Sequence, residues 1–248
     1  MKLLRLLAAA GFALLLAAPL VPANADELTE GQREEVGKLV EKYILDNPEI
    51  IMQAIEKLRE RQRLAEEEQR RAAMASLGDD LRSDPLTPPG GNPDGKVVVV
   101  EFFDYNCGYC KRVSPTVAQL LEANGDVKLV YKEFPVLGES SVQAARAALA
   151  SVKQGKYIEM HETMMNHRGR VGEAVIFAAA AQHGLDVEQL RKDMDSQEVT
   201  EAIERTYAVA QSLGIEGTPA FLIGKKLVPG AVSLETLQQL VDEARSGS

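Results

Sequence analysis

The chain has 248 residues, with 28 lysines and arginines against 37 aspartates and glutamates, and its formal net charge is −9. Its composition, 45% hydrophobic and 26% charged, is that of a folded globular protein and excludes disordered and collagen-like chains. The acidic balance argues against a general nucleic-acid-binding protein. The chain has two cysteines, which excludes a disulfide-dense scaffold and a zinc site made of four cysteines.

The first 25 residues have the layout of a secretory signal peptide. Lys2 and Arg5 precede the apolar stretch Leu6–Val21, and Ala23-Asn24-Ala25 supplies the small-x-small pattern of a cleavage site. The apolar stretch has 16 residues, fewer than the roughly 20 that span a bilayer, so a retained anchor is disfavoured. We expect cleavage after Ala25, export into an oxidising compartment and a mature net charge of −11.

Two helices are predicted before residue 78. Apolar residues recur every three or four positions in Thr29–Asp46, the pattern of a short amphipathic helix. Asn47 then suits a helix N-cap and Pro48 a first helical position, and neither Gly nor Pro follows before Leu77. One face of this second helix repeats at alternating spacings of four and three residues, which is a heptad seam: Ile51, Ile55, Leu58, Gln62, Ala65, Gln69 and Ala72.

The second helix has little apolar surface outside that seam. Eleven of the sixteen residues in Glu56–Arg71 are charged. Because most helix stability comes from packing, this helical arm, residues 26–77, must pack either against its own domain or against copies of itself. The narrow, seam-like stripe favours self-association, and we expect the arm to be an oligomerisation element.

Helix breakers crowd residues 78–95, which predicts a linker or an extended lead-in. After it the pattern becomes that of an α/β domain, in which strands alternate with helices. The predicted elements are a buried strand Val97–Phe103, a helix Cys110–Ala123, a strand Asp126–Phe134, a mainly helical segment Ser140–Leu213, a strand Ala220–Ile223, a short strand ending at Pro229 and a helix from Ser233.

The two cysteines, Cys107 and Cys110, lie where the first buried strand gives way to a helix. Unpaired backbone N–H groups and the helix dipole favour an anion at such a junction. Cys107 precedes the helix and is therefore the candidate thiolate and nucleophile, whereas Cys110 lies one turn in and is less accessible. A stabilised thiolate also makes the corresponding disulfide more oxidising.

Three kinds of site suit such a pair: a redox-active dithiol, a structural disulfide and half of a metal site. A structural disulfide across two residues closes a very small loop and gains little chain entropy. Two cysteines alone are able to bind a monovalent copper ion. A larger metal site would need histidine ligands, but the three histidines show no paired spacing near the cysteines: His161, His167 and His183. Methionines on one predicted helix also suggest copper, although such clusters are more often core residues: Met160, Met164 and Met165. We expect dithiol catalysis without a cofactor or metal, and copper binding is the alternative of another class.

The stretches Glu101–Arg112 and Gly217–Ala220 resemble the DsbA-like branch of the thioredoxin superfamily. Within that branch, the helical arm and the lead-in Gly91–Gly95 resemble the suppressor-of-copper-sensitivity protein C (ScsC) group. The resemblance covers about residues 84–246 and is looser in the arm. It implies an α/β thioredoxin fold, with a first part at residues 96–139, a helical insertion at 140–213 and a second part at 214–248.

The same resemblance implies roles for three more positions. Pro219 is implied to be a cis-proline that faces the cysteines and leaves the backbone groups of Thr218 free to pair with an extended substrate. Glu101 matches an acidic residue thought to assist proton transfer, and Lys132 in the next strand is a candidate partner for it. Without the family, residues 217–219 are a turn before a strand, and Glu101 is a strand residue with access to solvent.

The redox balance is expected to depend on residues beside the cysteines. Gly108 and Tyr109, between the two cysteines, are expected to tune the redox balance of the pair. DsbA has a histidine between its cysteines that is a cationic partner for the thiolate, and Tyr109 offers no such partner. Thr218 is similar to the threonine that disulfide isomerases commonly carry before the cis-proline. We therefore expect a less oxidising pair than in DsbA. Pro115, five residues after Cys110, is expected to kink its helix.

The residues and the resemblance together predict a periplasmic thiol–disulfide oxidoreductase. Cys107 attacks a substrate disulfide and Cys110 resolves the mixed disulfide. An isomerase or reductase of misfolded disulfide-containing proteins is favoured, because self-association gathers several Cys107 sites around one space; a DsbA-like dithiol oxidase is the alternative. The resemblance suggests a trimer formed through residues 26–77 and a membrane thiol-electron donor of the DsbD or ScsB type. We expect no nucleic-acid partner.

Overall fold

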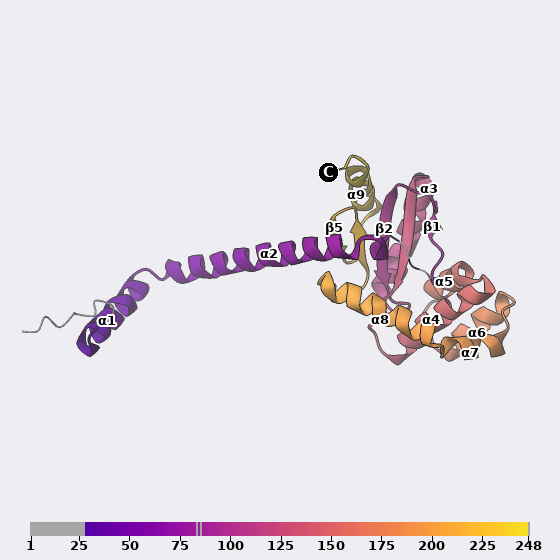
Figure 1. Cartoon of the computed structure of the whole chain (residues 1–248), viewed down its shortest axis with the longest axis horizontal. Coiled ribbons are helices and arrows are strands. Elements are labelled where there is room, and N and C mark those ends of the chain that lie inside the picture. The colour runs from indigo at the N-terminus through magenta and orange to yellow at the C-terminus, as the bar shows by residue number, and fades with distance from the viewer. Residues whose placement is uncertain (1–27, 83, 85, 248) are drawn as a thin grey trace, which may run out of the picture. The chain divides into compact units, whose positions relative to one another are not determined.

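The computed structural model describes residues 28–82, 84 and 86–247, so the expected signal peptide and its cleavage site at Ala25 lie outside the described residues. The chain divides into two compact units, and the boundary falls between Arg59 and Glu60. Figure 1 shows the elements of both units in chain order.

The first unit contains helix α1, Glu30–Asp46, and the start of helix α2, Glu49–Leu77. Thr29 caps α1: its side chain accepts a hydrogen bond from the backbone N–H of Gln32, whose side chain in turn accepts from the Thr29 backbone. No residue of α1 is buried. The large apolar side chains of this unit are therefore exposed, among them Leu39, 67% exposed, and Leu58, 56% exposed.

The last turns of α2 belong to the second unit and pack against it. Ala73, Met74 and Leu77 lie on a cluster of buried residues beneath the sheet. The Arg70 side chain donates from Nε to the carbonyl oxygen of Leu213 at 3.3 Å. Ala72, the last position of the expected seam, is exposed. The face that packs on the domain is therefore rotated away from the heptad seam.

The second unit is built around a five-stranded sheet in the order β1-β3-β2-β4-β5. The two central strands, β2 and β3, are parallel and pair Phe103 with Glu133, whereas the other neighbours are antiparallel. The strands are β1 Gly90–Gly91, β2 Val97–Phe103, β3 Val127–Glu133, β4 Ala220–Ile223 and β5 Lys226–Pro229. The alternation of side chains along β2 and β3 gives the sheet two buried faces.

Each face of the sheet has its own hydrophobic core. Val97, Val99 and Phe103 point to the face covered by α3, Gly108–Ala123, and α9, Leu234–Arg245. On the other face lie side chains packed against the ends of α8 and α2: Val100, Phe102, Val130, Ala210, Leu213 and Leu222. The cysteines lie on the first face, because α3 covers it.

The segment predicted as a linker is partly ordered structure. It contains a short 3-10 helix, Gly78–Leu81, and strand β1, which pairs with β3. Gly90 is required where β1 crosses Tyr131, because a Cβ atom there would lie 2.6 Å from the tyrosine hydroxyl oxygen. Sequence patterns missed this strand, since a two-residue glycine strand has no hydrophobic alternation.

The mainly helical segment is inserted between β3 and β4. Its helices are α4 Glu139–Ser151, α5 Tyr157–Asn166, α6 Glu173–Gln182, α7 Val187–Met194 and α8 Gln197–Ser212. Figure 1 shows α4, α5, α6 and α7 gathered at the lower right of the sheet in this view, with α8 extending to the left of them. Within the described part of the chain, no helix combines the length and the apolar character needed to cross a membrane.

Candidate active site

Cys107 is the N-cap residue of α3, in an extended backbone conformation, and Cys110 lies in the first turn. The backbone N–H of Cys110 points to the Cys107 sulfur at 3.5 Å. Both cysteines are free thiols and buried, Cys107 at 6% exposure and Cys110 at 0%. The helix terminus expected at this junction thus places one sulfur against its unpaired N–H groups.

The loop before β4 closes the site from the other side. The Thr218–Pro219 peptide bond is cis, and the Cys107 sulfur lies 3.2 Å from the carbonyl oxygen of Thr218, to which it donates when it is protonated. Residues 107 and 218 are 111 positions apart in the chain, and the antiparallel pairing of β2 with β4 brings them together. The tertiary structure therefore assembles the two motifs Glu101–Arg112 and Gly217–Ala220 into one site.

The environment of Cys107 strongly favours its ionised form. Its pKa falls from 9.0 to about 5, chiefly because the Cys110 side chain donates a hydrogen bond to the sulfur. A hydrogen bond from the Thr218 side chain and the backbone N–H groups of Tyr109 and Cys110 lower the pKa further, while burial opposes them. Cys107 is therefore a thiolate at neutral pH, and thiolates are the attacking form in disulfide exchange.

Cys110 has the opposite environment. Its pKa is raised above the usual 9.0, because its proton is held in the hydrogen bond to Cys107 and because it is buried; the nearby charge of Glu101 acts in the same direction. The two thiols thus have divided roles: Cys107 is charged and slightly exposed, and Cys110 is fully buried and keeps its proton until Cys107 has reacted.

Glu101 lies on β2 beneath this pair and is 4% exposed. Burial raises the pKa of its carboxyl group from 4.5 to about 8. The alternative prediction, that Glu101 is a strand residue with access to solvent, is therefore wrong. A carboxyl group with such a pKa exchanges a proton near neutral pH, which is the property needed in a group that serves Cys110.

The expected pairing of Glu101 with Lys132 is also wrong. Glu101 is in register with Tyr131 on β3, and successive side chains of a strand point to opposite faces. Lys132 consequently points to the other face of the sheet, where its Nζ lies 2.9 Å from Asp84 in an ion pair with both side chains less than a tenth exposed.

Two residues that the sequence did not single out shape the loop before Cys107. Asp104 is buried, and its carboxylate accepts from the backbone N–H of Asn106 at 2.7 Å and of Leu137 at 3.0 Å. The Asn106 amide accepts from the backbone N–H of Val171 at 2.7 Å and donates to Ser141 at 3.2 Å. Asn106 thus ties the active-site loop to the helical insertion, which no local pattern could have revealed.

A buried polar cluster lies behind the same loop. The Tyr105 hydroxyl donates to Glu133 at 2.8 Å, and the Tyr157 hydroxyl donates to the same oxygen at 3.0 Å. The second carboxyl oxygen, Oε2, has no hydrogen-bond partner among the described residues. Burial raises the pKa of Glu133 well above its usual value and lowers that of His161, which lies 3.1 Å from the Tyr105 hydroxyl, to about 3.

The remaining predicted positions lie around the pair. Tyr109 is 60% exposed, and the guanidinium group of Arg112 lies 4.3 Å from the centre of its ring. No atom lies within 4 Å of a Cβ built on Gly108. Pro115 lies inside α3 and is exposed. The two residues between the cysteines therefore face solvent, although Cys107 itself is only 6% exposed.

The residues considered as copper ligands lie elsewhere. The three methionines are buried in the core on the α5 side of the domain: Met160, Met164 and Met165. His161 contacts the aromatic rings of Phe103 and Tyr131. Among the described residues there is no group of three or more histidine, cysteine, aspartate or glutamate side chains with the geometry of a metal site.

Two family models match the chain. The model of the DSBA-like thioredoxin domain matches residues 98–242, and that of the copper resistance protein ScsC N-terminal domain matches residues 32–65. Among curated proteins, the Na(+)/H(+) antiporter NhaA 1 of Salinispora arenicola is 28% identical over 160 residues, which are 64% of this chain. The chain spans about a quarter, 24%, of the length of that relative.

Solved structures give the same family. A thioredoxin-like oxidoreductase from Silicibacter pomeroyi is 48% identical, with a TM-score of 0.67, over 69% of this chain and 99% of that one. Proteus mirabilis ScsC in a transitional conformation is 32% identical, with a TM-score of 0.65, over 89% of this chain and 100% of that one. The chain therefore belongs to the DsbA-like family of thioredoxin-fold thiol–disulfide oxidoreductases and carries an ScsC-type N-terminal domain.

Proposed function

We propose that the protein is a periplasmic thiol–disulfide oxidoreductase that acts on protein substrates as a disulfide isomerase or reductase. The observation that carries this proposal is the state of Cys107, a thiolate with a pKa of about 5 that faces the Thr218 backbone. The periplasmic location rests on the signal-peptide pattern of residues 1–25.

In this reaction the Cys107 thiolate attacks one sulfur of a substrate disulfide. A mixed disulfide forms, and the second substrate sulfur leaves as a thiolate. That thiolate can attack another disulfide of the substrate, which completes an isomerisation and releases Cys107. Alternatively, Cys110 gives up its proton to the ionised form of Glu101, which is the minor form at pH 7 and grows as the pH rises towards 8. Cys110 then attacks Cys107, which releases a reduced substrate and leaves a Cys107–Cys110 disulfide.

The depressed pKa of Cys107 also bears on how oxidising the cysteine pair is. The reference values are roughly 3.5 for DsbA and about 7 for thioredoxin, and Cys107 lies between them at about 5. Because thiolate stabilisation makes a disulfide more oxidising, we infer a redox pair between those two proteins. The same property supports the second candidate function, a DsbA-like oxidase.

The arm distinguishes the two candidates. Its exposed apolar side chains favour assembly through residues 26–77, with a trimer suggested by the ScsC resemblance. Assembly would bring several Cys107 sites to one substrate, which suits isomerisation. An isomerase must be returned to the dithiol form, so a membrane thiol-electron donor of the DsbD or ScsB type is the expected partner.

The test compares the full mature chain with a variant lacking residues 26–65, which keeps the last turns of α2 on the sheet. Molar mass by light scattering and reactivation of scrambled ribonuclease are measured for both, with Cys107→Ser as the inactive control. We expect the full chain to be oligomeric and active, and the truncated chain to be monomeric and to lose isomerase activity while still reducing a small disulfide. A monomeric full chain, or unchanged isomerase activity after truncation, would contradict the isomerase proposal and favour the DsbA-like oxidase.

A further inference from the structure

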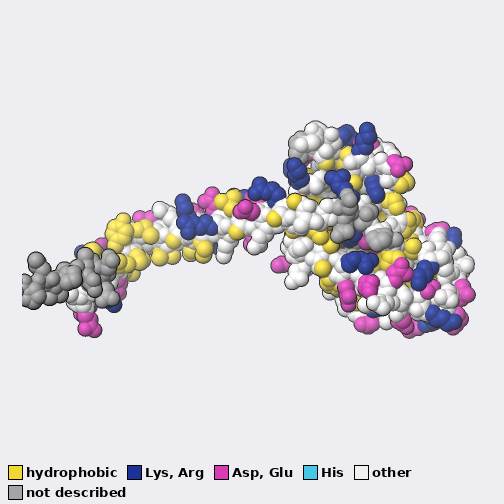
Figure 2. All heavy atoms as spheres, viewed as in Figure 1, with side chains coloured by type: hydrophobic (Ala, Val, Ile, Leu, Met, Phe, Trp, Pro, Cys, Tyr) yellow, Lys and Arg dark blue, Asp and Glu magenta, His cyan; other side chains and the backbone are white. Residues whose placement is uncertain are grey.

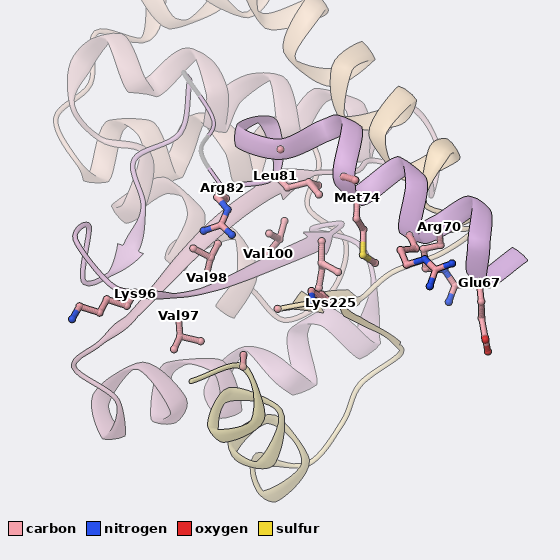
Figure 3. Close-up of a pocket in the computed structure, with 16 residues that line it drawn as sticks. Glu67, Arg70, Met74, Leu81, Arg82, Lys96, Val97, Val98, Val100 and Lys225 are labelled. Atoms are coloured by element: carbon pink, nitrogen blue, oxygen red, sulfur yellow. The ribbon is translucent and has the colours of Figure 1, made fainter. Parts of the chain in front are cut away.

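A second concave site lies at the end of the sheet opposite to the cysteines. This site, called the α2 groove here, is bounded by the last turns of α2, the 3-10 helix after it, the start of β2 and the turn from β4 to β5 (Figure 3). Its volume is about 630 Å³, within the range of roughly 300–1,000 Å³ that small-molecule sites occupy. Cys107 follows the other end of β2, so the groove is separate from the redox site.

The walls of the groove are apolar. Met74 and Leu81 come from the helical side, and Val98, Val100 and Leu222 come from the sheet. Figure 3 shows Met74 and Leu81 directed towards the strand that carries the two valines. These side chains belong to the core on the second face of the sheet, so the groove exposes an edge of that core to solvent.

The rim of the groove is positively charged in an otherwise acidic protein. Five cations line it together with a single described acid, Glu67, although the chain as a whole carries a net charge of −9: Arg70, Arg71, Arg82, Lys96 and Lys225. None of these five cations forms an ion pair with a carboxylate that the structure describes. An anionic group could therefore pair with them without displacing an existing ion pair, although Arg70 also donates from Nε to the carbonyl oxygen of Leu213.

We propose that the α2 groove binds a single-chain anionic amphiphile, a free long-chain carboxylate. Its carboxylate would pair with the arginines of the rim, and its acyl chain would lie along Val98, Val100 and Met74, which removes apolar surface on both sides from water. The ligand contacts both α2 and the sheet, and its binding therefore stabilises the packing of α2 on the domain.

The test titrates dodecanoate, below its micelle concentration, into the full mature chain in the dithiol form and follows binding by calorimetry. We expect saturable binding of one dodecanoate per chain and a higher Tm. The double variant Arg71→Glu and Arg82→Glu should bind at least about tenfold more weakly, because two attractive charges become repulsive. Ala75→Phe, which fills the groove and keeps the rim charges, should weaken binding by a similar factor.

The matched control is the double variant Arg59→Glu and Arg61→Glu, which makes the same charge change on α2 outside the groove and should bind like the wild type. Reaction of Cys107 with a small disulfide reports that every variant is folded. Equal binding of a dodecyl trimethylammonium cation, or unchanged affinity in both groove variants, would overturn the proposal. So would binding to anionic phospholipid vesicles or to an acidic peptide but not to dodecanoate, because the occupant would then be a membrane or a protein.

Discussion

The charge on the Cys107 sulfur depends on hydrogen bonds from two separate parts of the chain. Cys110 and the backbone of the first turn of α3 supply the local donors, and Thr218 supplies one from across the sheet. Each donor stabilises the thiolate relative to the thiol, so each raises the fraction of Cys107 that is ionised at neutral pH and the oxidising strength of the disulfide. The residue before Pro219 is thus an adjustable part of the redox site.

Replacing Thr218 by valine is expected to raise the pKa of Cys107, because one donor to the thiolate is lost while burial is kept. In the wild type, the ultraviolet absorbance of the thiolate should appear as the pH rises through about 5. Its midpoint should move upward in Thr218→Val and should stay in place in Thr200→Val, a matched change in α8. An unshifted midpoint in Thr218→Val would show that the backbone donors suffice.

The sign of the accompanying stability change follows from the same pKa. Because the pKa of Cys107 is lower in the folded dithiol form than the ordinary 9.0, its stabilising contribution is fully present above about pH 9 and is lost as the pH falls through about 5. The disulfide form has no such group. Unfolding by denaturant should therefore show the dithiol form gaining stability relative to the disulfide form as the pH rises through this window.

Replacing Glu101 by glutamine is expected to stabilise the protein and slow its reaction. The carboxyl group has a pKa of about 8 when folded, so the folded state must hold a proton that the unfolded chain has released. This costs stability increasingly from about pH 4.5 to pH 8, by roughly 3 kcal/mol at pH 7. Glutamine removes that cost, but it cannot accept the proton of Cys110.

The measurement for Glu101→Gln has two parts. Urea unfolding at pH 7 should show the gain in free energy of unfolding, and the gain should shrink as the pH falls towards 4.5. Single-turnover kinetics should show slower release of the mixed disulfide, on the order of 100-fold, with the Cys107 attack step unchanged. A faster or equal release step would contradict a role of Glu101 in proton transfer.

At the scale of elements, the active-site loop is held by contacts to the helical insertion. The side chain of Asn106 bridges to the backbone of Val171 in both directions, and Lys111 of α3 donates to the carbonyl oxygens of His167 and Gly169 at 2.6 and 2.9 Å. The insertion thus contributes to the position of the cysteines although it supplies neither of them.

Asn106→Ala is expected to lower the free energy of unfolding by about 1–3 kcal/mol, because the partly buried N–H of Val171 loses its acceptor. Hydrogen exchange should increase in the loop around Val171. Asn166→Ala, an exposed asparagine at the end of α5, is the control and should change neither quantity. Equal stability of Asn106→Ala and the wild type would mean that water replaces the amide without cost.

At the scale of the whole molecule, the arm exposes apolar side chains in the single chain (Figure 2), and the proposed self-association would cover them. Ile55 and Leu58 of the seam are 37% and 56% exposed, and α1 has no buried residue. Leu58→Glu is expected to reduce the molar mass measured by light scattering, because it places a charge in the seam. Leu64→Glu changes a residue of α2 outside the seam that is also 50% exposed, and it should leave the mass unchanged.

The sequence by itself predicted most of the elements, because the signals that define them are local. Hydrophobic periodicity placed the arm helices at Thr29–Asp46 and Pro48–Leu77, and the structure has them at Glu30–Asp46 and Glu49–Leu77. The strand Val97–Phe103 has the predicted bounds. The junction of this strand with α3 likewise identified Cys107 as the thiolate candidate from helix-terminus electrostatics alone.

What only the tertiary structure decided are the contacts between distant residues. Sequence cannot state that Lys132 points away from Glu101 towards Asp84, because the face of a strand residue depends on register. It cannot show that Thr218 donates a hydrogen bond to Cys107 or that the Asn106 side chain accepts one from the backbone of Val171. Nor can it show that the last turns of α2 pack on the sheet with a face other than the heptad seam. The acidic net charge, which argued against a nucleic-acid-binding protein, likewise gave no sign of the basic rim of the α2 groove. Net charge carries no information about where charged side chains gather in space.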